Sequence, residues 1–141
     1  MKYDDFVKEV QTRARLNTLG EAVEATRATL EALGKCISQE EANHLMSELP
    51  KEIGVYLEDI GEPERFSLDD FFKYINQNER KSVGLAESVH HARSVISVLQ
   101  DAVSKGEMND IKSMLSEEFE PLFRAGSEDY MSMKDYKTKH R

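Results

Sequence analysis

Apolar and polar positions alternate along the chain with the period of an α-helix, and this pattern occurs twice. Between residues 19 and 37, mostly apolar residues recur at spacings of four, three, four, three and four, and residues 85–103 repeat these spacings. Such spacings place the residues on one face of a helix. The matched positions are 66 residues apart: Leu19, Val23, Thr26, Leu30, Leu33 and Ile37 correspond to Leu85, Val89, Ala92, Ile96, Leu99 and Val103.

The segments around these two helices repeat in the same order. "YDDFVKEV" at residues 3–10 corresponds to "LDDFFKYI" at residues 68–75, and a Ser-x-x-Glu sequence follows each long helix, at residues 38–41 and 104–107. Ser-x-x-Glu is typical of a capping box, in which the serine caps the new helix and the glutamate side chain returns to the serine backbone. We therefore expect both glutamates to have a structural role in closing these caps.

The pattern predicts an all-α fold built from a duplicated helical domain. Each half contains a short helix, a longer helix, a capped third helix and a last helical turn, while Gly61 and Pro63 break the pattern between the halves. We predict two similar three-to-four-helix repeats, at about residues 3–58 and 67–123, packed around one core with pseudo-twofold symmetry. Each long helix has a second stripe of small or apolar residues, which predicts that the two form the buried central pair.

Composition narrows the setting of the protein. A chain of 141 residues is long enough to bury the core of one domain. Its single cysteine, Cys36, excludes an intramolecular disulfide, and its place in the second stripe predicts a small buried side chain. The first ten residues contain two aspartates instead of the apolar run of a secretion signal, and the apolar stretches are far shorter than the ~20 residues of a membrane span. We expect a cytoplasmic protein without a membrane partner.

Charge is distributed unevenly along the chain. Residues 124–141 contain five Lys/Arg and three Asp/Glu, so their net charge is +2, and −10 remains for residues 1–123 out of a total of −8. An acidic body disfavours nucleic acid as a partner. We expect residues 1–123 to form a single domain and residues 124–141 a flexible or loosely docked C-terminal tail. Four apolar side chains of this tail suit docking to an apolar groove of a partner: Tyr130, Met131, Met133 and Tyr136.

The stretches "RATLEALGKCIS", "EANHLMSELP" and "FSLDDFFKYI" carry a family resemblance. Over about residues 3–123 the chain resembles a family of small bacterial and archaeal proteins catalogued as domain of unknown function 2267. The resemblance implies a shared fold and no particular activity. The resembling positions are Arg27, Ala28, Leu30, Leu33, Gly34, Leu49, Pro50, Phe66, Leu68, Phe71, Arg93, Val95 and Leu99.

Two Glu-x-x-His sequences are the candidate metal ligands. Helical bundles that hold two iron or manganese ions use two such motifs plus two further glutamates, all pointing inward. The helical pattern instead puts the second motif on a polar stripe, with Ser94, Ser97 and Asp101, that we expect to face solvent. The sequence therefore predicts no metal and no cofactor, and the residues that a metal site would use are Glu41, His44, Glu87 and His90.

A second candidate polar site involves His91 and two equivalent arginines, Arg27 and Arg93. His91 falls on the partly buried second stripe of its helix, and Glu87 one turn earlier could take its proton. The arginines lie at matching positions of the two halves, where they could bind one anion from both sides. The alternative is that each pairs locally, as Arg27 could with Glu31 one turn later.

These observations favour a non-catalytic helical interaction or regulatory module over an enzyme. The chain contains neither a Gly-rich phosphate loop nor a Gly-x-Ser-x-Gly sequence. We expect protein partners, with a homodimer among the possibilities. The alternative is an enzyme or metal-binding protein that uses Glu87, His90, His91 and the repeat arginines.

Overall fold

The computed structural model describes residues 1–79 and 83–124, and within these ranges it contains eight α-helices and no strand. The protein therefore has the all-α fold that the sequence predicts. The first half contains α1 (Tyr3–Ala14), α2 (Leu19–Gly34), α3 (Gln39–Ser47), α4 (Lys51–Gly54) and the 3-10 turn η1 (Val55–Leu57). The second half contains α5 (Leu68–Asn78), α6 (Leu85–Ala102), α7 (Lys105–Ser113), the 3-10 turn η2 (Glu117–Phe119) and α8 (Glu120–Phe123).

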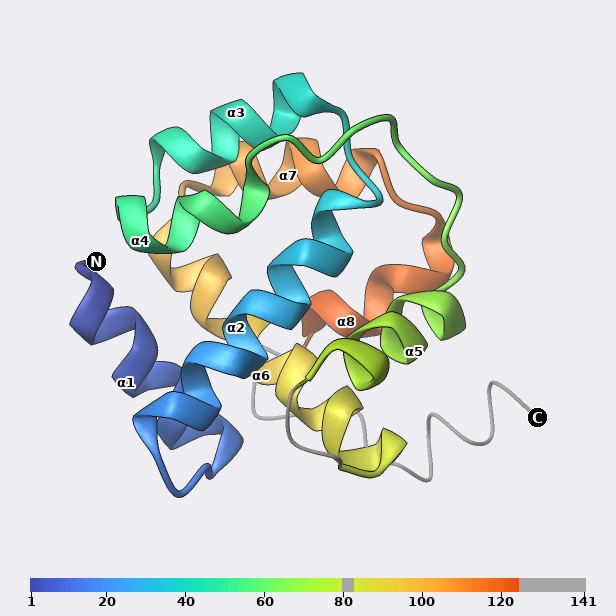
Figure 1. Ribbon diagram of the computed structural model, residues 1–141. Coiled ribbons are helices and arrows are strands. Elements are labelled where there is room, and N and C mark those ends of the chain that lie inside the picture. The colour runs from blue at the N-terminus through green and yellow to red at the C-terminus, as the bar shows by residue number, and fades with distance from the viewer. Residues whose placement is uncertain (80–82, 125–141) are drawn as a thin grey trace.

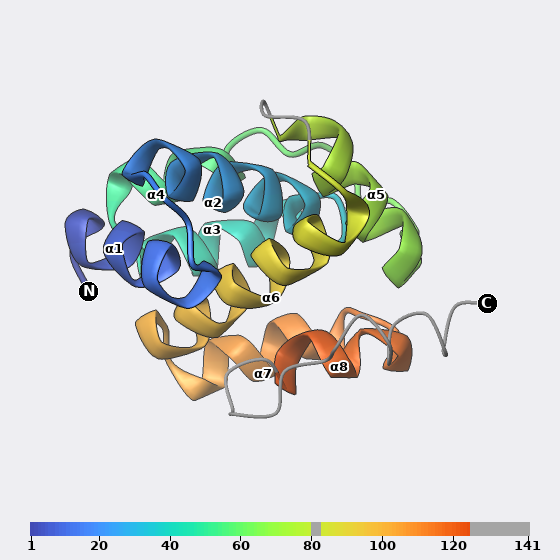
Figure 2. The same ribbon diagram turned by 90° about the horizontal axis from the view of Figure 1, so that it is seen from below.

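The two long helices, α2 and α6, form the centre of the molecule. They contact one another, and both α1 and α5 pack against the two of them (Figure 1). The turn η1 packs on α2, and α8 packs on α6, as the second view shows for the lower face (Figure 2). The third helices of the two halves, α3 and α7, contact one another beyond the ends of this central pair.

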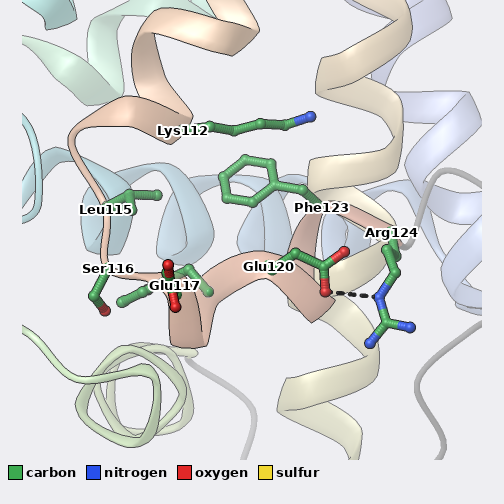
Figure 3. A pocket seen from close by; sticks show the side chains of 8 residues that line it. Lys112, Leu115, Ser116, Glu117, Glu120, Phe123 and Arg124 are labelled. Atoms are coloured by element: carbon green, nitrogen blue, oxygen red, sulfur yellow. Dashed lines mark ion pairs between the residues drawn. The ribbon is translucent and has the colours of Figure 1, made fainter.

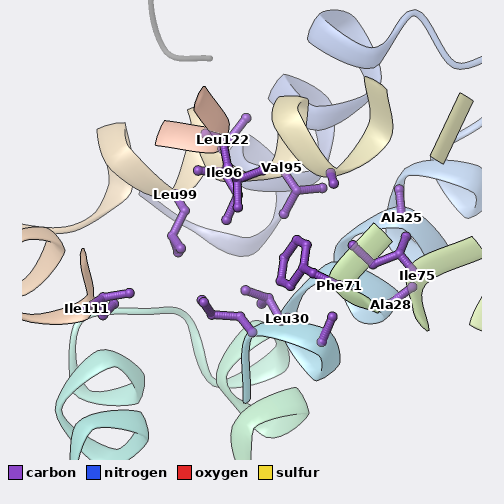
Figure 4. Close-up of a cluster of buried hydrophobic side chains, with 14 of the residues drawn as sticks. Ala25, Ala28, Leu30, Phe71, Ile75, Val95, Ile96, Leu99, Ile111 and Leu122 are labelled. Atoms are coloured by element: carbon purple, nitrogen blue, oxygen red, sulfur yellow. The ribbon is translucent and has the colours of Figure 1, made fainter. Parts of the chain in front are cut away.

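Small side chains allow the central helices to be buried on more than one side. Four alanines of α2 have no exposed surface: Ala22, Ala25, Ala28 and Ala32. On α6 the equivalent faces carry Ala92, Val95, Ile96 and Leu99, which are also fully buried. Larger side chains from the flanking helices, such as Phe71 and Ile75, fill the space between them (Figure 4). This packing agrees with the two apolar stripes on each long helix.

The helix bounds keep the offset found in the sequence, with one informative departure. Helices α3 and α7 begin and end 66 residues apart. Gly34 ends α2, and a Cβ added to it would lie 2.8 Å from Ile60 Cγ2, so the linker between the halves requires a residue without a side chain there. At the matching position of α6, Gln100 donates from Nε2 to the carbonyl oxygen of Phe123 at 2.8 Å.

The polar stripe of α6 does not face solvent, which corrects the prediction made from its pattern. Ser94 and Ser97 are buried because α1 crosses this face of the helix. Arg13 of α1 donates to Ser97 Oγ at 2.7 Å and to Asp101 Oδ2 at 2.6 Å. The stripe is therefore a polar contact between the first helix of one half and the long helix of the other.

None of the helices in the described ranges combines the length and the apolar character that crossing a membrane would need.

The equivalent core positions of the two halves provide a test of this packing. Leu33 and Leu99 have no exposed surface, so we expect Leu33→Ala and Leu99→Ala each to lower the free energy of unfolding by about 2–5 kcal/mol. Leu19→Ala is the control, because Leu19 is largely exposed and its truncation should have a small effect. Urea titration measures all three, and a harmless change at either core leucine would contradict the packing described.

Candidate functional sites

Two glutamates face one another where α3 meets α7. Glu41 lies in the first turn of α3 and Glu107 in the first turn of α7. Their exposed fractions are only 7% and 6%, although both residues carry an ionisable carboxyl group. The structure thus brings the two repeat-equivalent glutamates together at one buried point.

The caps of α3 and α7 form only in part. Ser38 Oγ accepts from the amide of Glu41 at 3.1 Å, and Ser104 Oγ accepts from the amide of Glu107 at 3.2 Å, as predicted. The reciprocal glutamate bond closes the cap of α2, whereas at α3 and α7 the carboxylates turn toward the helix contact. The prediction of complete capping boxes at these two helices is therefore wrong for the glutamates.

Glu48 takes over the capping role that Glu107 leaves. Located just after α3, it accepts from the amide of Ser104 at 2.7 Å and from Ser104 Oγ at 3.1 Å. Glu107 is therefore not needed to close its own cap. The Oε2 atoms of Glu41 and Glu107 are both buried and have no hydrogen-bond partner.

The buried environment changes the acidity of this pair. Burial, followed by the hydrogen bond to Glu41 and repulsion from Glu41, Glu48 and Asp110, raises the pKa of Glu107 to about 8. Two carboxylates this close resist being ionised together, and only a proton on one of them creates the hydrogen bond between them. At neutral pH the pair is therefore expected to hold one proton when no cation is bound.

His44 completes a cluster of three groups that could hold a metal ion. One ligand atom from each of Glu41, His44 and Glu107 lies within 4.8 Å of the other two. His44 Nδ1 is 3.7 Å from Glu41 Oε2, and 57% of the histidine side chain is exposed. The sequence identified the Glu41 and His44 motif but missed Glu107, although its equivalence to Glu41 in the repeat was a signal that could have found it.

The second Glu-x-x-His motif is placed differently. Glu87 is exposed in the first turn of α6, while half-buried His90 turns toward α1, with Nε2 3.2 Å from the carbonyl oxygen of Ala14. Burial and the neighbouring His91 lower the pKa of His90. Within residues 1–79 and 83–124, Glu87 and His90 do not belong to a cluster of three potential ligands.

His91 is buried against a carboxylate that the sequence did not indicate. Its Nδ1 lies 2.7 Å from Glu79 Oε2, just beyond the end of α5, and both side chains are more than nine-tenths buried. Ser88 Oγ donates to the other carboxylate oxygen of Glu79 at 2.7 Å. Because the hydroxyl and the imidazole both bind the carboxylate, this arrangement does not activate the serine as a nucleophile. Glu79, rather than Glu87, is the contact of His91 in this network.

The two repeat arginines occupy different surroundings. Arg27 bonds to Glu31, to Glu24 at 2.8 Å and to the carbonyl oxygen of Asn78 at 2.6 Å. The hydrogen bond to Glu24 is the largest of the contacts that raise the pKa of Arg27, so local carboxylates balance its charge. Arg93 is 1% exposed within α6.

Cys36 is chemically quiet in this fold. Its thiol is buried near the end of α2 and lies 3.5 Å from the carbonyl oxygen of Ala32. Burial is the main cause that raises its pKa to about 12, which disfavours the reactive thiolate.

A pocket of about 300 Å³ lies between the end of α7 and α8 (Figure 3). Lys112 extends over the ring of Phe123, with Nζ 5.4 Å from the ring centre, and Glu120 pairs with Arg124 at 2.9 Å. Leu115 and Phe119 supply further apolar surface. The sequence analysis did not identify this pocket. The predicted tail residues Tyr130, Met131, Met133 and Tyr136 lie outside the described residues.

Comparison with known families identifies the chain. The model of the family DUF2267, described as an uncharacterized conserved protein, matches residues 3–122. The chain belongs to the DUF2267 family. A search of curated proteins found no match to it. The family description assigns no activity, so the function of this DUF2267 protein must be argued from its own geometry.

The carboxylate pair predicts how the stability of the DUF2267 domain depends on pH. Glu107 has a higher pKa in the folded state than the 4.5 of an ordinary glutamate, so between about pH 5 and pH 8 the folded state binds more protons than the unfolded state. Its contribution to stability is present at low pH and is lost as pH rises through about 8. Glu107→Gln should flatten this dependence and raise stability at pH 8.5.

Urea unfolding at pH 5, 7 and 8.5 in EDTA measures this effect. Glu40→Gln, in the same turn of α3 but exposed, is the matched control and should follow the wild type. Parallel pH profiles for the wild type and Glu107→Gln would exclude a strained carboxylate at this position.

The histidines should differ sharply in their effect on stability. His91→Ala leaves Glu79 buried without its imidazole partner, so we expect a loss of about 2–4 kcal/mol. His44→Ala removes an exposed side chain and should cost less than about 0.5 kcal/mol. Chemical denaturation at pH 7 compares the two variants, and equal effects would argue against the buried pair.

Proposed function

We propose that this DUF2267 protein is a non-catalytic helical interaction module that associates with a second copy of itself. In this proposal the tail of one copy, residues 125–141, docks into the pocket between α7 and α8 of the other. The observation that carries it is the pocket itself, whose apolar lining includes Leu115, Phe119 and Phe123. Arg124, the last described residue before the tail, forms part of its rim.

The composition of the tail supports this occupant. Its tyrosines and methionines offer the large side chains that an apolar pocket of this size receives. Residues 124–141 have five Lys/Arg against three Asp/Glu, whereas the body of the chain is acidic. The pocket rim includes Glu117 and Glu120, so a basic segment approaches an acidic surface and is attracted to it at low salt.

The state of the reactive side chains supports a role without catalysis. The Cys36 thiol is buried with a raised pKa, and Ser88 and His91 both bind Glu79 instead of one another. A buried reduced cysteine also suits a cytoplasmic setting, which we include in the proposal.

We further propose that the two halves arose by internal duplication and are related by an approximate twofold axis. The equal offsets of α2 with α6 and of α3 with α7 support this interpretation. So do the shared contacts, because exchange of the halves converts the α1 contacts with α2 and α6 into those of α5.

Deletion of residues 125–141 tests the interaction. We expect the full-length protein to self-associate in analytical ultracentrifugation, more strongly at 0.05 M than at 0.5 M salt, because shortening of the Debye length weakens the charge attraction. The deletion should abolish association and leave the melting temperature unchanged.

Leu115→Lys, which places a charge in the pocket, should weaken association as the deletion does. Val55→Lys is the matched control, because Val55 is an exposed apolar residue outside the pocket. A full-length protein that stays monomeric would overturn the proposal. An unchanged mass with a lowered melting temperature after deletion would mean that the tail packs on its own domain, which would also overturn it.

A further inference from the structure

The contact between α3 and α7 contains buried negative charge that its hydrogen bonds leave unbalanced. A buried carboxylate is costly unless donors or a cation satisfy it. Glu41 and Glu107 are each more than nine-tenths buried, yet the Oε2 atom of each has no hydrogen-bond partner. The backbone amide that would ordinarily receive Glu107 is bound by Glu48 instead. The carboxylates are therefore free to bind a ligand at the helix contact.

The geometry suits a small cation. Ligands at about 2.0–2.2 Å from a tetrahedral zinc ion lie roughly 3.3–3.6 Å from one another. His44 Nδ1 and Glu41 Oε2 are already 3.7 Å apart, on successive turns of α3. The complete set, which includes Glu107, spans no more than 4.8 Å, so small rotations of the side chains would close it around one ion.

The ligand types select the class of metal. Calcium and magnesium prefer sites made entirely of oxygen ligands, whereas an imidazole nitrogen with carboxylates suits zinc, manganese or ferrous iron. Because more than half of the His44 side chain is exposed, an ion could reach the site from solvent without opening the core. The remaining coordination positions would face the same side and take water.

We propose that Glu41, His44 and Glu107 bind one divalent transition-metal ion of the zinc or manganese kind, which joins α3 to α7. The ion would replace the proton that the two carboxylates otherwise share and would fasten the third helix of one half to that of the other. The Glu87 and His90 motif has no part in this site. The proposal is independent of self-association through the tail, so either can fail alone.

Metal titration of the full-length, tag-free protein tests the site. After treatment with EDTA, ZnCl₂ and, separately, MnCl₂ are titrated by calorimetry at pH 7.5, and melting temperatures are measured with each metal. We expect one ion to bind per chain and to raise the melting temperature, because the ion binds only the folded state. Glu107→Gln and His44→Ala should each weaken binding at least tenfold and remove the thermal shift.

Two controls separate this site from casual binding to surface histidines and carboxylates. Glu40→Gln and His90→Ala should keep the affinity of the wild type, because neither belongs to the cluster. Circular dichroism checks that every variant is folded, and Glu107→Gln preserves the shape of the side chain.

Absence of one-to-one binding of either metal would overturn the proposal. Binding that survives Glu107→Gln and His44→Ala would do the same, because the ion would then lie elsewhere. If Glu107→Gln raises the melting temperature while neither metal affects the wild type, the pair holds only a proton and the site is not a metal site.

Discussion

The close packing of α2 against α6 is the constraint on which the rest of the structure depends. Small, fully buried side chains such as Ala25 and Ala92 let these helices lie in the centre with neighbours on several sides. Short connections then lead from each long helix to the third helix of its half, so α3 and α7 are brought together. Because serine caps stand at the same offset in both, Glu41 and Glu107 arrive at one point from opposite sides.

That meeting of equivalent residues produces the least comfortable contact of the fold. Two carboxylates must lose most of their water at the α3 contact with α7, and the raised pKa of Glu107 expresses the cost. Only a proton or a cation relieves it. By capping Ser104 in place of Glu107, Glu48 keeps the pair available for either. A duplicated chain can thus create a polar site at its centre from residues that have ordinary capping roles in other helices.

The sequence predicted what depends on local pattern and missed what depends on how helices cross. Apolar spacing gave the helices, the buried stripes and the buried Cys36, and the serine caps were recognised from residue type and spacing. Ser97 was assigned to solvent because periodicity does not reveal that α1 lies over that face and brings Arg13 to it. Likewise, Glu79 meets His91 only through the packing of α5 on α6. The turn of Glu41 and Glu107 away from their caps also depends on a contact between distant segments.

The most direct test of this arrangement is a double-mutant cycle on the carboxylate pair. Free energies of unfolding would be measured by urea titration at pH 8.5 in EDTA for Glu41→Gln, Glu107→Gln and the double variant. Since each single change removes the same repulsion, we predict that both singles stabilise the protein. The double variant should gain less than their sum, by about 1 kcal/mol or more. Additive effects, equal within about 0.3 kcal/mol, would show that the two glutamates do not meet in solution.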